Sequence, residues 1–423
     1  QAVGKIRQIW HPGERDWYVK QRKKYSKTCI VEQMTLFFTN DSEHLEELYW
    51  DWKSKGFILR SHASSSTYTT DLNATEPKIR YVSSAVDNTL YALDSEGNLL
   101  QRCFDLPNQK GVKCTIYGQN APDNAKWLWR RMNAGEFSDV KFVGPIIPSS
   151  LDNRLYMLTT KGQAMEILVS ESYTKWTTFH APLDVRLMLI SDAQTFPDIF
   201  FAIDIEGELY EFDIKSKTWG YCGNTGVPLQ LYEGVAVNTP AKKAMYLIDV
   251  EGNLVEYSVA KGKWKSLGHP PGCLLRSPPS ASQLGNVMHF FLIGDDAALY
   301  TYDVVVKPGP NKNKAKWTQH GCYNGKKLRQ ERVVALASDI IYVVTEDGLF
   351  VERSVERVWP TLKQTSLLSS ESSTRTIQLQ RKKRYLWKWK LLGSYESIRQ
   401  RSQTTIILHK LAMQDQDEPS MRR

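Results

Sequence analysis

Glutamate is the residue whose placement in this sequence most clearly suggests chemistry. It recurs two residues into the second strand of a repeated strand–turn–strand pattern, as Glu47, Glu166, Glu211 and Glu256. Gln101 and Thr301 take this place in two further repeats, and the spacing puts Glu352 one residue out of register. A carboxylate that recurs at one strand position either anchors the fold through hydrogen bonds or accepts protons from ligand hydroxyls. Both interpretations are open.

One repeat combines this glutamate with a cation and an aromatic residue. Arg154 precedes a turn at Gly162, and Glu166 follows it, so antiparallel pairing can bring their side chains close together. A guanidinium beside a carboxylate offers fixed donors and acceptors to vicinal hydroxyls, and Trp176 on the following strand could stack on a sugar ring. We predict a carbohydrate site at these three residues. A plain cross-strand salt bridge is the alternative.

A second aromatic cluster lies near the start of the repeats. Trp50 and Trp52 follow Glu47 in the stretch Leu45-Glu-Glu-Leu-Tyr-Trp-Asp-Trp52. A tryptophan beside carboxylates is a common way to stack on the apolar face of a sugar. We therefore include Glu47, Trp50 and Trp52 among the candidate ligand-binding residues.

No catalytic or metal-binding motif accompanies these residues. The sequence has no GxSxG, HExxH or P-loop motif, its histidines are scattered, and no Cys/His group has zinc spacing. We therefore expect no catalytic residue, no metal site, no cofactor and no enzymatic activity. An enzyme stays open as an alternative, because a site assembled from distant loops leaves little trace in the sequence.

The elements that position these residues repeat along the chain. Apolar strands run into tight turns such as Asp94-Ser-Glu-Gly97, Asp204-Ile-Glu-Gly207 and Asp249-Val-Glu-Gly252. Turn centres fall at 43, 97, 162, 207, 252, 297 and 348, and three successive gaps are 45 residues. That period is typical of a four-stranded blade. The sequence predicts an all-β fold, a β-propeller of seven blades with four antiparallel strands each. Six blades are the alternative.

Two further strands accompany each hairpin. A run rich in β-branched residues precedes it and is expected to be innermost, as in Gly234-Val-Ala-Val. A tryptophan follows it and opens a shorter outer strand, as at Trp219 and Trp264. We predict that both tryptophans pack between blades and have a structural role.

The sequence around these turns resembles a known group of proteins. Gly207-Glu-Leu-Tyr-Glu211 and Gly252-Asn-Leu-Val-Glu256, each followed by a tryptophan, are similar to repeats of tectonin-type propellers and fucose-binding propeller lectins. The resemblance covers about residues 34–360. It implies a sugar site built from the strand glutamate, an arginine about a dozen residues earlier and an aromatic platform. Only Arg154 with Glu166 matches both charged groups.

These observations lead to a functional expectation. We expect a non-catalytic, lectin-like module that binds a glycan or a glycosylated partner. A protein–protein interaction scaffold is the first alternative, and an enzyme with a hidden site is the second.

The charge distribution divides the chain into three parts. The net charge is +9, and residues 1–27 carry +6 while residues 364–423 carry +7, which leaves −4 for the middle. We expect a basic N-terminal segment over 1–27 that could supply a closing strand, a propeller over 28–363 and a basic, serine-rich tail over 364–423. Because the positive charge lies outside the repeats, we expect no nucleic-acid partner. No apolar run is long enough to predict a transmembrane helix.

Asparagine and cysteine residues give weaker indications of the compartment. Asn40 and Asn73 lie in glycosylation triplets, which favours the secretory pathway over the cytoplasm. Cys103 and Cys114 flank a short connection and could form a disulfide. Isolated buried thiols are the alternative.

Overall fold

The computed structural model describes most of the repeats and part of each end. The described residues are 3–8, 35–40, 45–51, 56–61, 77–84, 90–105, 112–113, 126–132, 137–149, 154–169, 174–179, 182, 185–191, 196, 198–239, 242–284, 287–305, 316–337, 340–358, 384–394 and 397. Within this part of the chain no helix has the length and apolar character needed to cross a membrane.

Antiparallel sheets of consecutive strands make up the molecule. The first sheet has β1 (Val3–Gln8), β2 (Thr35–Asn40), β3 (Leu45–Asp51) and β4 (Gly56–Ser61). The next has β5 (Ile79–Ser84), β6 (Leu90–Asp94), β7 (Leu99–Asp105), β8 (Val112–Lys113) and β9 (Lys126–Arg131), and here β7 pairs with both β8 and β9. The third has β10 (Phe142–Ser149), β11 (Arg154–Thr159), β12 (Ala164–Val169) and β13 (Thr174–Phe179).

Four more sheets follow in the same order of strands. They comprise β14 (Leu187–Ser191), β15 (Ile199–Asp204), β16 (Leu209–Asp213) and β17 (Thr218–Gly223), then β18 (Val235–Thr239), β19 (Lys242–Ile248), β20 (Leu254–Ser258) and β21 (Lys263–Gly268). The last two comprise β22 (Ser280–Leu284), β23 (Val287–Ile293), β24 (Leu299–Val305) and β25 (Lys316–Gly321), then β26 (Val334–Ala337), β27 (Ile340–Val344), β28 (Leu349–Val358) and β29 (Arg384–Ser394).

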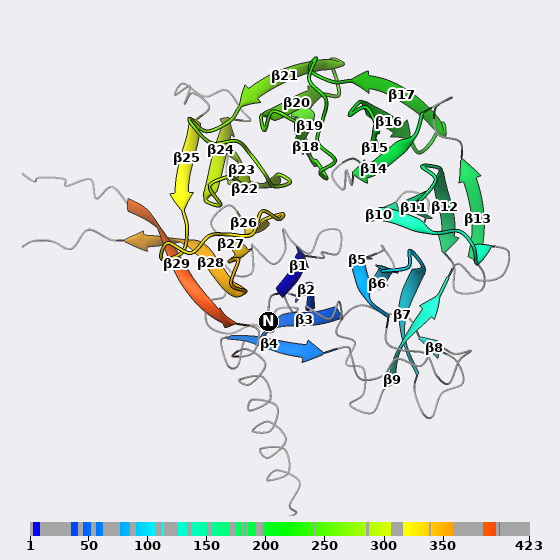
Figure 1. Cartoon of the computed structure of the whole chain (residues 1–423), viewed down its shortest axis with the longest axis horizontal. Helices are drawn as coiled ribbons and strands as arrows, with labels where there is room; N and C mark the ends of the chain where they lie inside the picture. The colour runs from blue at the N-terminus through cyan, green and yellow to red at the C-terminus, as the bar shows by residue number, and fades with distance from the viewer. Residues whose placement is uncertain are drawn as a thin grey trace, which may run out of the picture.

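The sheets stand radially around one axis, with the first strand of each sheet innermost (Figure 1). This arrangement confirms the predicted all-β propeller. Six blades have four strands each, and the sheet of β5 to β9 has five. A single sheet cannot bury both of its faces, and radial stacking solves this because each sheet packs on its neighbours.

The hydrophobic core lies between neighbouring sheets. One cluster joins Phe201 and Leu209 of one sheet to Met245, Leu247 and Val255 of the next, and all five are buried. Each such side chain contributes on the order of 1.5–3 kcal/mol when it leaves water. The strands of the hairpins are therefore apolar on both faces, as the sequence indicated.

A tight turn joins the second and third strands in the six sheets from β5 onwards. Asp204 accepts hydrogen bonds at Oδ1 from the backbone N–H groups of Glu206 and Glu208, both at 2.9 Å, which fixes the loop. Gly207 adopts a φ of 76°, a left-handed conformation that favours glycine. The same conformation at other predicted turn centres confirms their positions, and it occurs at Gly97, Gly162, Gly252, Ala297 and Gly348.

These turns also join one sheet to the next. The carbonyl of Gly207 accepts a hydrogen bond from the N–H of Leu229 (2.9 Å), and that of Gly97 accepts one from Phe142 (2.8 Å). A Cβ atom on Gly207 would lie 2.6 Å from the nitrogen of Leu229. Glycine is needed there both for its conformation and for this close approach of two backbones.

The outer strands carry the predicted tryptophans. Trp219 packs edge to face on Phe200 with ring centroids 5.8 Å apart, and it lies 4.8 Å from Phe212. The ring of Trp264 lies 5.1 Å from Tyr257, and its Nε1 donates to the carbonyl of Cys222 at 2.7 Å. Both tryptophans are half-buried against the core, which fits the structural role expected for them.

Both ends of the chain contribute strands, and here the structure differs from the expected boundaries. β1, from the basic segment expected as a possible closing strand, pairs with β2 as the innermost strand of the first sheet. It also lies against β26 of the last sheet, so it meets the last blade by packing. β29, from the segment expected as a tail, pairs with β28 over its whole length. The propeller therefore extends beyond residues 28–363.

Candidate functional site

The recurring polar position faces an aromatic residue in every sheet. The partner on the second strand is always Phe or Tyr, in the pairs Phe37–Glu47, Tyr91–Gln101, Tyr156–Glu166, Phe201–Glu211, Tyr246–Glu256, Phe291–Thr301 and Tyr342–Glu352. Glu352 is thus in register with the others, and its expected offset is wrong. Glu352 lies four residues after Gly348, as Glu211 lies four residues after Gly207, and this distance from the turn sets the register.

Arg154 and Glu166 are in contact, as predicted. Arg154 Nη1 forms an ion pair with Glu166 Oε1, and the side chain of Glu166 is only 7% exposed. A second cation comes from the next sheet, because Lys217 Nζ lies 2.6 Å from Glu166 Oε2 and 2.6 Å from the hydroxyl of Tyr156. Lys217 occupies the turn between β16 and β17 in a left-handed conformation with φ of 57°. Both carboxylate oxygens therefore already bind a cation.

Other blades use the same position in the same way. Lys242 Nζ lies 2.8 Å from Glu256 and 5.4 Å from the ring centroid of Tyr246. Gln101 donates to the hydroxyl of Tyr91 at 3.1 Å and accepts a hydrogen bond from Arg130. This recurrence supports the anchoring interpretation of the position, with side-chain cations as the donors.

Glu211 departs from this pattern. It faces Phe201, which offers no hydroxyl group, and it is half-buried. Burial, followed by the charges of Asp213 and Asp198, raises the pKa of its carboxyl group. The acidic position therefore tolerates different partners from one blade to the next.

The remaining predicted sugar-binding residues are placed only in part. Trp176 pairs with Ile167 on β12, whereas the residue opposite Glu166 is Thr177. Glu47 pairs with Phe37 and Arg60, and Trp50 pairs with Phe57. Trp52 lies outside the described residues. The register therefore puts Trp176 one residue away from the position that faces Glu166.

The modification sites stay predictions. Asn40 ends β2 and pairs with Val3, and Cys103 pairs with Leu128. Asn73 and Cys114 lie outside the described residues, so neither the second glycosylation site nor the disulfide is tested.

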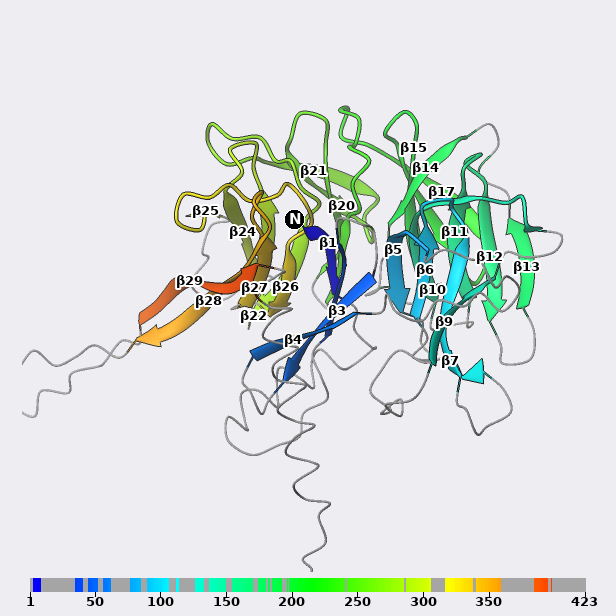
Figure 2. The ribbon, with the colours of Figure 1, turned by 60° about the horizontal axis from the view of Figure 1, so that its bottom comes forward.

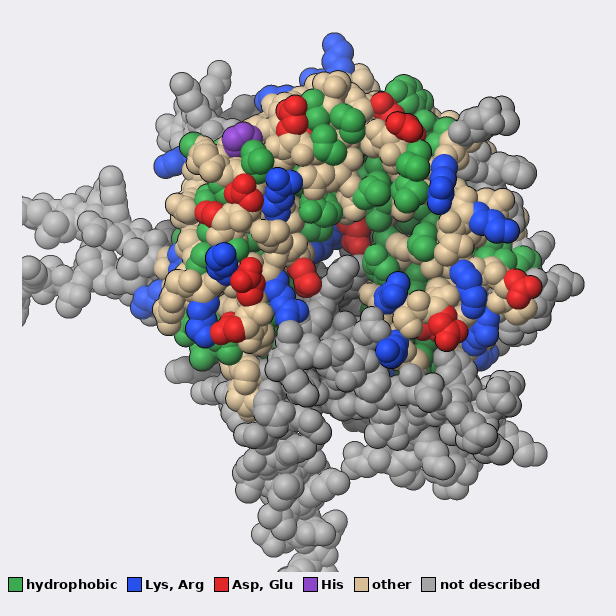
Figure 3. Space-filling model, in the orientation of Figure 1, with side chains coloured by type: hydrophobic (Ala, Val, Ile, Leu, Met, Phe, Trp, Pro, Cys, Tyr) green, Lys and Arg blue, Asp and Glu red, His purple; other side chains and the backbone are tan. Residues whose placement is uncertain are grey.

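An exposed apolar surface lies on one side of the ring, and the sequence analysis did not find it. We call this side the turn face, because it carries the turns between second and third strands and the loops that lead into the innermost strands (Figure 2). Ile205, Leu231 and Val250 are 55%, 48% and 49% exposed there. Pro228 is also exposed, and its carbonyl accepts a hydrogen bond from the N–H of Val250 at 2.9 Å. Hydrophobic side chains gather over the sheets of β14 to β17 and of β18 to β21 in Figure 3.

We call Ile205, Pro228, Leu231 and Val250 the apolar patch. A Cβ atom on Gly207 would lie 2.8 Å from the Cβ of Pro228, so Pro228 sits between the turn that carries Ile205 and the turn that carries Val250. Only two other large hydrophobic side chains are exposed in the described part of the chain, Tyr221 and Leu391. The patch is therefore a local concentration, not a general property of the surface.

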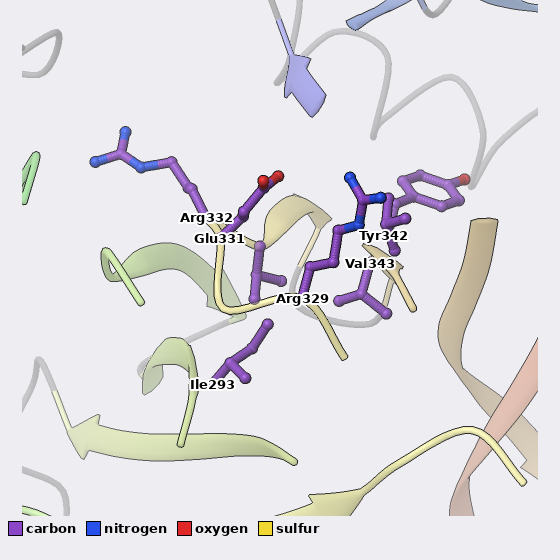
Figure 4. Close-up of a pocket in the computed structure, with 8 residues that line it drawn as sticks. Ile293, Arg329, Glu331, Arg332, Tyr342 and Val343 are labelled. Carbon is purple, nitrogen blue, oxygen red and sulfur yellow. The ribbon is translucent and has the colours of Figure 1, made fainter. Parts of the chain in front are cut away.

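The loop that carries Leu231 is fixed to a more distant blade. Arg332 donates to the carbonyls of Glu233 and Gly234 at 2.8 and 2.9 Å, and it lies 3.3 Å from the carboxylate of Glu233. This contact joins the loop before β18 to the loop before β26, which belong to sheets separated in the chain by the sheet of β22 to β25. Arg332 also borders a small pocket with Arg329, Glu331 and Tyr342 (Figure 4). The loop that carries Pro228 and Leu231 is thus held by Gly207 at one end and by Arg332 at the other.

One cluster on the turn face has the residue types of a metal site. Cys273, Asp295 and Asp296 lie close together. The thiol of Cys273 is 3.4 Å from Asp296 Oδ1, and Tyr300 donates to Asp296 Oδ2 at 2.6 Å. Burial raises the pKa of the Cys273 thiol, which keeps it protonated and disfavours the thiolate that binds metals. We assign it as a hydrogen-bonded thiol.

Comparisons with known proteins give no family. No protein-family model and no curated protein matches the chain. Among solved structures, YCF48 bound to a D1 peptide is 13% identical, with a TM-score of 0.48 over 75% of this chain and 88% of that one. The Cps50 (Swd1) β-propeller domain of Myceliophteria thermophila is 9% identical, with a TM-score of 0.45 over 74% and 90%.

A further match is YCF48 from Cyanidioschyzon merolae, at 10% identity and a TM-score of 0.42 over 65% of this chain and 81% of that one. At these scores the matches carry no argument about function, and the propeller assignment rests on the strand topology. None of the three is named as a tectonin or a lectin, so that resemblance stays a prediction.

Proposed function

We propose that this propeller is a non-catalytic scaffold that binds a protein partner through the apolar patch on its turn face. One observation carries the proposal: three of the five exposed large hydrophobic side chains in the described part lie together there. Exposed apolar groups that cluster on a folded surface typically mark interaction sites. A few such side chains at the centre of an interface supply most of its affinity.

We count the sheet of β5 to β9 as the seventh blade of this scaffold. β9 pairs with β7 over six residues and carries Trp127 and Trp129, as the outer strands of other blades carry tryptophans. β8 is then an additional short strand at the end of β7. This count agrees with the seven turn centres in the sequence.

A selection from a library of displayed twelve-residue peptides tests the proposal. Peptides retained by the full chain are synthesised, and their affinities for variants are measured by fluorescence anisotropy. The double variant Ile205→Asp/Val250→Asp should weaken binding by at least about tenfold, because each apolar anchor contributes on the order of 1 kcal/mol or more. Leu391→Asp, at a site 46% exposed elsewhere, is the matched control and should bind as the parent does.

Two results would overturn the proposal. One is a selection that yields no retained peptide. The other is a set of peptides whose binding is the same in the parent and in Ile205→Asp/Val250→Asp.

Carbohydrate binding at Arg154, Glu166 and Trp176 is a second candidate. The contact between Arg154 and Glu166 favours it, and the side chain of Arg154 is 24% exposed. The occupied carboxylate argues for a structural role instead, since a sugar hydroxyl would have to compete with two cations. Retention on immobilised glycans that Arg154→Ala abolishes would favour this candidate over the protein scaffold.

A further inference from the structure

The partner's charge can be inferred from how the repeats differ at one position. In the six sheets from β5 onwards, the residue that leads into the innermost strand gives its carbonyl to the N–H of that sheet's own turn. Lys78, Lys141, Arg186 and Lys327 are such lead-in residues, with N···O distances of 2.7 to 3.1 Å. The same bond identifies Pro228 and Leu274 as the lead-in residues of two further blades, at 2.9 and 2.8 Å. Four described blades thus have a cation where two have an uncharged side chain.

The lead-in residue of one blade also packs on the turn of the blade before it. A Cβ atom on Gly97 would lie 3.2 Å from the Cβ of Lys141, and one on Gly162 would lie 2.8 Å from the Cγ of Arg186. The corresponding neighbours of Gly207 and Gly252 are Pro228 and Leu274, both at 2.8 Å. Each turn is therefore faced by the lead-in residue of the next blade.

This geometry decides which turn carboxylates have a cation beside them. Glu96 stands on the turn that faces Lys141, and Lys141 Nζ donates to Asn98 of that turn at 2.7 Å. Glu206 and Glu251 occupy the same turn position and are exposed, but they face Pro228 and Leu274. Arg186, the nearest lead-in cation before them, extends over Gly162 on the other blade.

The two carboxylates belong to the same surface as the apolar patch. Glu206 follows Ile205 and Glu251 follows Val250 in the sequence, so each apolar anchor has an exposed acid next to it. The nearby Glu208 already accepts hydrogen bonds from Tyr221 (3.2 Å) and Asn224 (2.9 Å). Glu251 accepts one long hydrogen bond from the amide of Asn253 at 3.5 Å, and both Glu206 and Glu251 are exposed. Glu206 and Glu251 are thus the acids that a partner's cations can reach.

We infer that the partner of the turn face is a basic segment, in which Lys or Arg residues flank an apolar anchor. The inference rests on the proposed protein-binding function and adds the charge of the partner. Complementary charge raises the rate of encounter and rejects partners of the wrong sign. An acidic segment would place its carboxylates beside Glu206 and Glu251 and would be repelled.

The peptides obtained in the selection described above provide the test. Their sequences should be enriched in Lys and Arg around apolar residues. The double variant Glu206→Lys/Glu251→Lys should bind them at least about tenfold more weakly, and their affinity for the parent should fall as salt is raised. Glu96→Lys is the matched control, since it changes the same turn position on another blade, and it should leave affinity within about twofold.

The outcomes separate this inference from the proposed function. Peptides that depend on Ile205 and Val250 but carry no excess of Lys and Arg would overturn the inference and leave the function standing. Equal losses in Glu96→Lys and Glu206→Lys/Glu251→Lys would also overturn it, because the attraction would then be general. Selection of acidic peptides by the parent would likewise overturn the inference.

Discussion

Arg154 is more exposed than its partner Glu166, and the burial of Glu166 determines how much stability the protein loses when Arg154 is removed. Glu166 is almost fully buried, so Arg154→Ala leaves a buried carboxylate with Lys217 as its remaining cation. We expect the free energy of unfolding to fall by about 1–3 kcal/mol, the cost of a poorly satisfied buried polar group. Chemical denaturation measures it.

Lys215→Ala is the matched control for Arg154→Ala. Lys215 pairs with Asp198 at 3.4 Å, and both side chains are well exposed. Such pairs contribute about 0–1 kcal/mol. If Arg154→Ala is no more destabilising than Lys215→Ala, Glu166 does not depend on Arg154.

His320 gives the molecule a pH dependence of known sign. Burial, reinforced by the charge of Arg353, lowers the pKa of His320 to about 4. The unfolded chain binds this proton near pH 6.5, so it gains protons before the folded chain does. The free energy of unfolding should therefore fall as the pH drops from about 6.5 towards 4. Denaturation at pH 7.5, 6 and 5 should show a smaller fall in His320→Gln, and an unchanged slope would contradict this.

At the residue scale the sequence predicted contacts within a hairpin and missed those between blades. The spacing of Arg154 and Glu166 around Gly162 was enough to place them together. Lys217 lies 51 positions from Glu166 on another sheet, and only the packing of blades brings it near. No local pattern in the sequence encodes that approach.

Turns are the elements that join neighbouring blades, and Gly207 shows why. Replacement by Ala imposes a left-handed conformation on a side chain, at about 1–2 kcal/mol. The added Cβ would also approach Leu229 N to 2.6 Å, which should cost a further ~1–3 kcal/mol. Gly226 has a φ of 91° with nothing within 4 Å of its Cβ position, so Gly226→Ala should show only the conformational cost.

Thermal or chemical unfolding of the two variants checks this expectation. Equal destabilisation by Gly207→Ala and Gly226→Ala would mean that the close approach of blades at Leu229 adds nothing.

Strands and turns were predictable because their signals are local. Apolar runs ending in Asp-x-Glu-Gly fix both the hairpin and its register. The strands at the two ends lacked that signal. β1 and β29 follow no such turn, so β1 was expected only as a possible closing strand and β29 fell within the expected tail, whereas both find partners in sheets. Each of these strands pairs with the edge strand of a sheet, β2 or β28. Whether such an edge is available depends on the fold of the whole ring.

The thermal stability of the propeller should depend on β29. Arg353 of β28 lies over the rings of Trp389 and Trp387, at 4.8 and 5.9 Å. Deleting residues 364–423 removes those rings and leaves an edge strand unpaired. We expect the melting temperature to fall by roughly 5 °C or more, whereas a chain ending at Ser397 should melt like the full chain. Equal melting of both truncations would show that β29 adds no stability.

At the scale of the whole molecule the sequence indicated the architecture but not its binding surface. Ile205 and Val250 were counted as parts of strand–turn patterns, where most apolar residues are buried. Both residues are exposed at their turns, and Pro228, on the loop that leads into β18, lies between those turns.

Every sheet is built from strands that follow one another in the chain, and this bears on biogenesis. A ribosome releasing the chain from its N-terminus would deliver the blades one at a time, each able to pair internally before the next emerges. The packing of β26 against β1 requires the last sheet, so the ring would stay open until that sheet has been made. The apolar faces flanking that seam would be the surfaces a chaperone meets during translation.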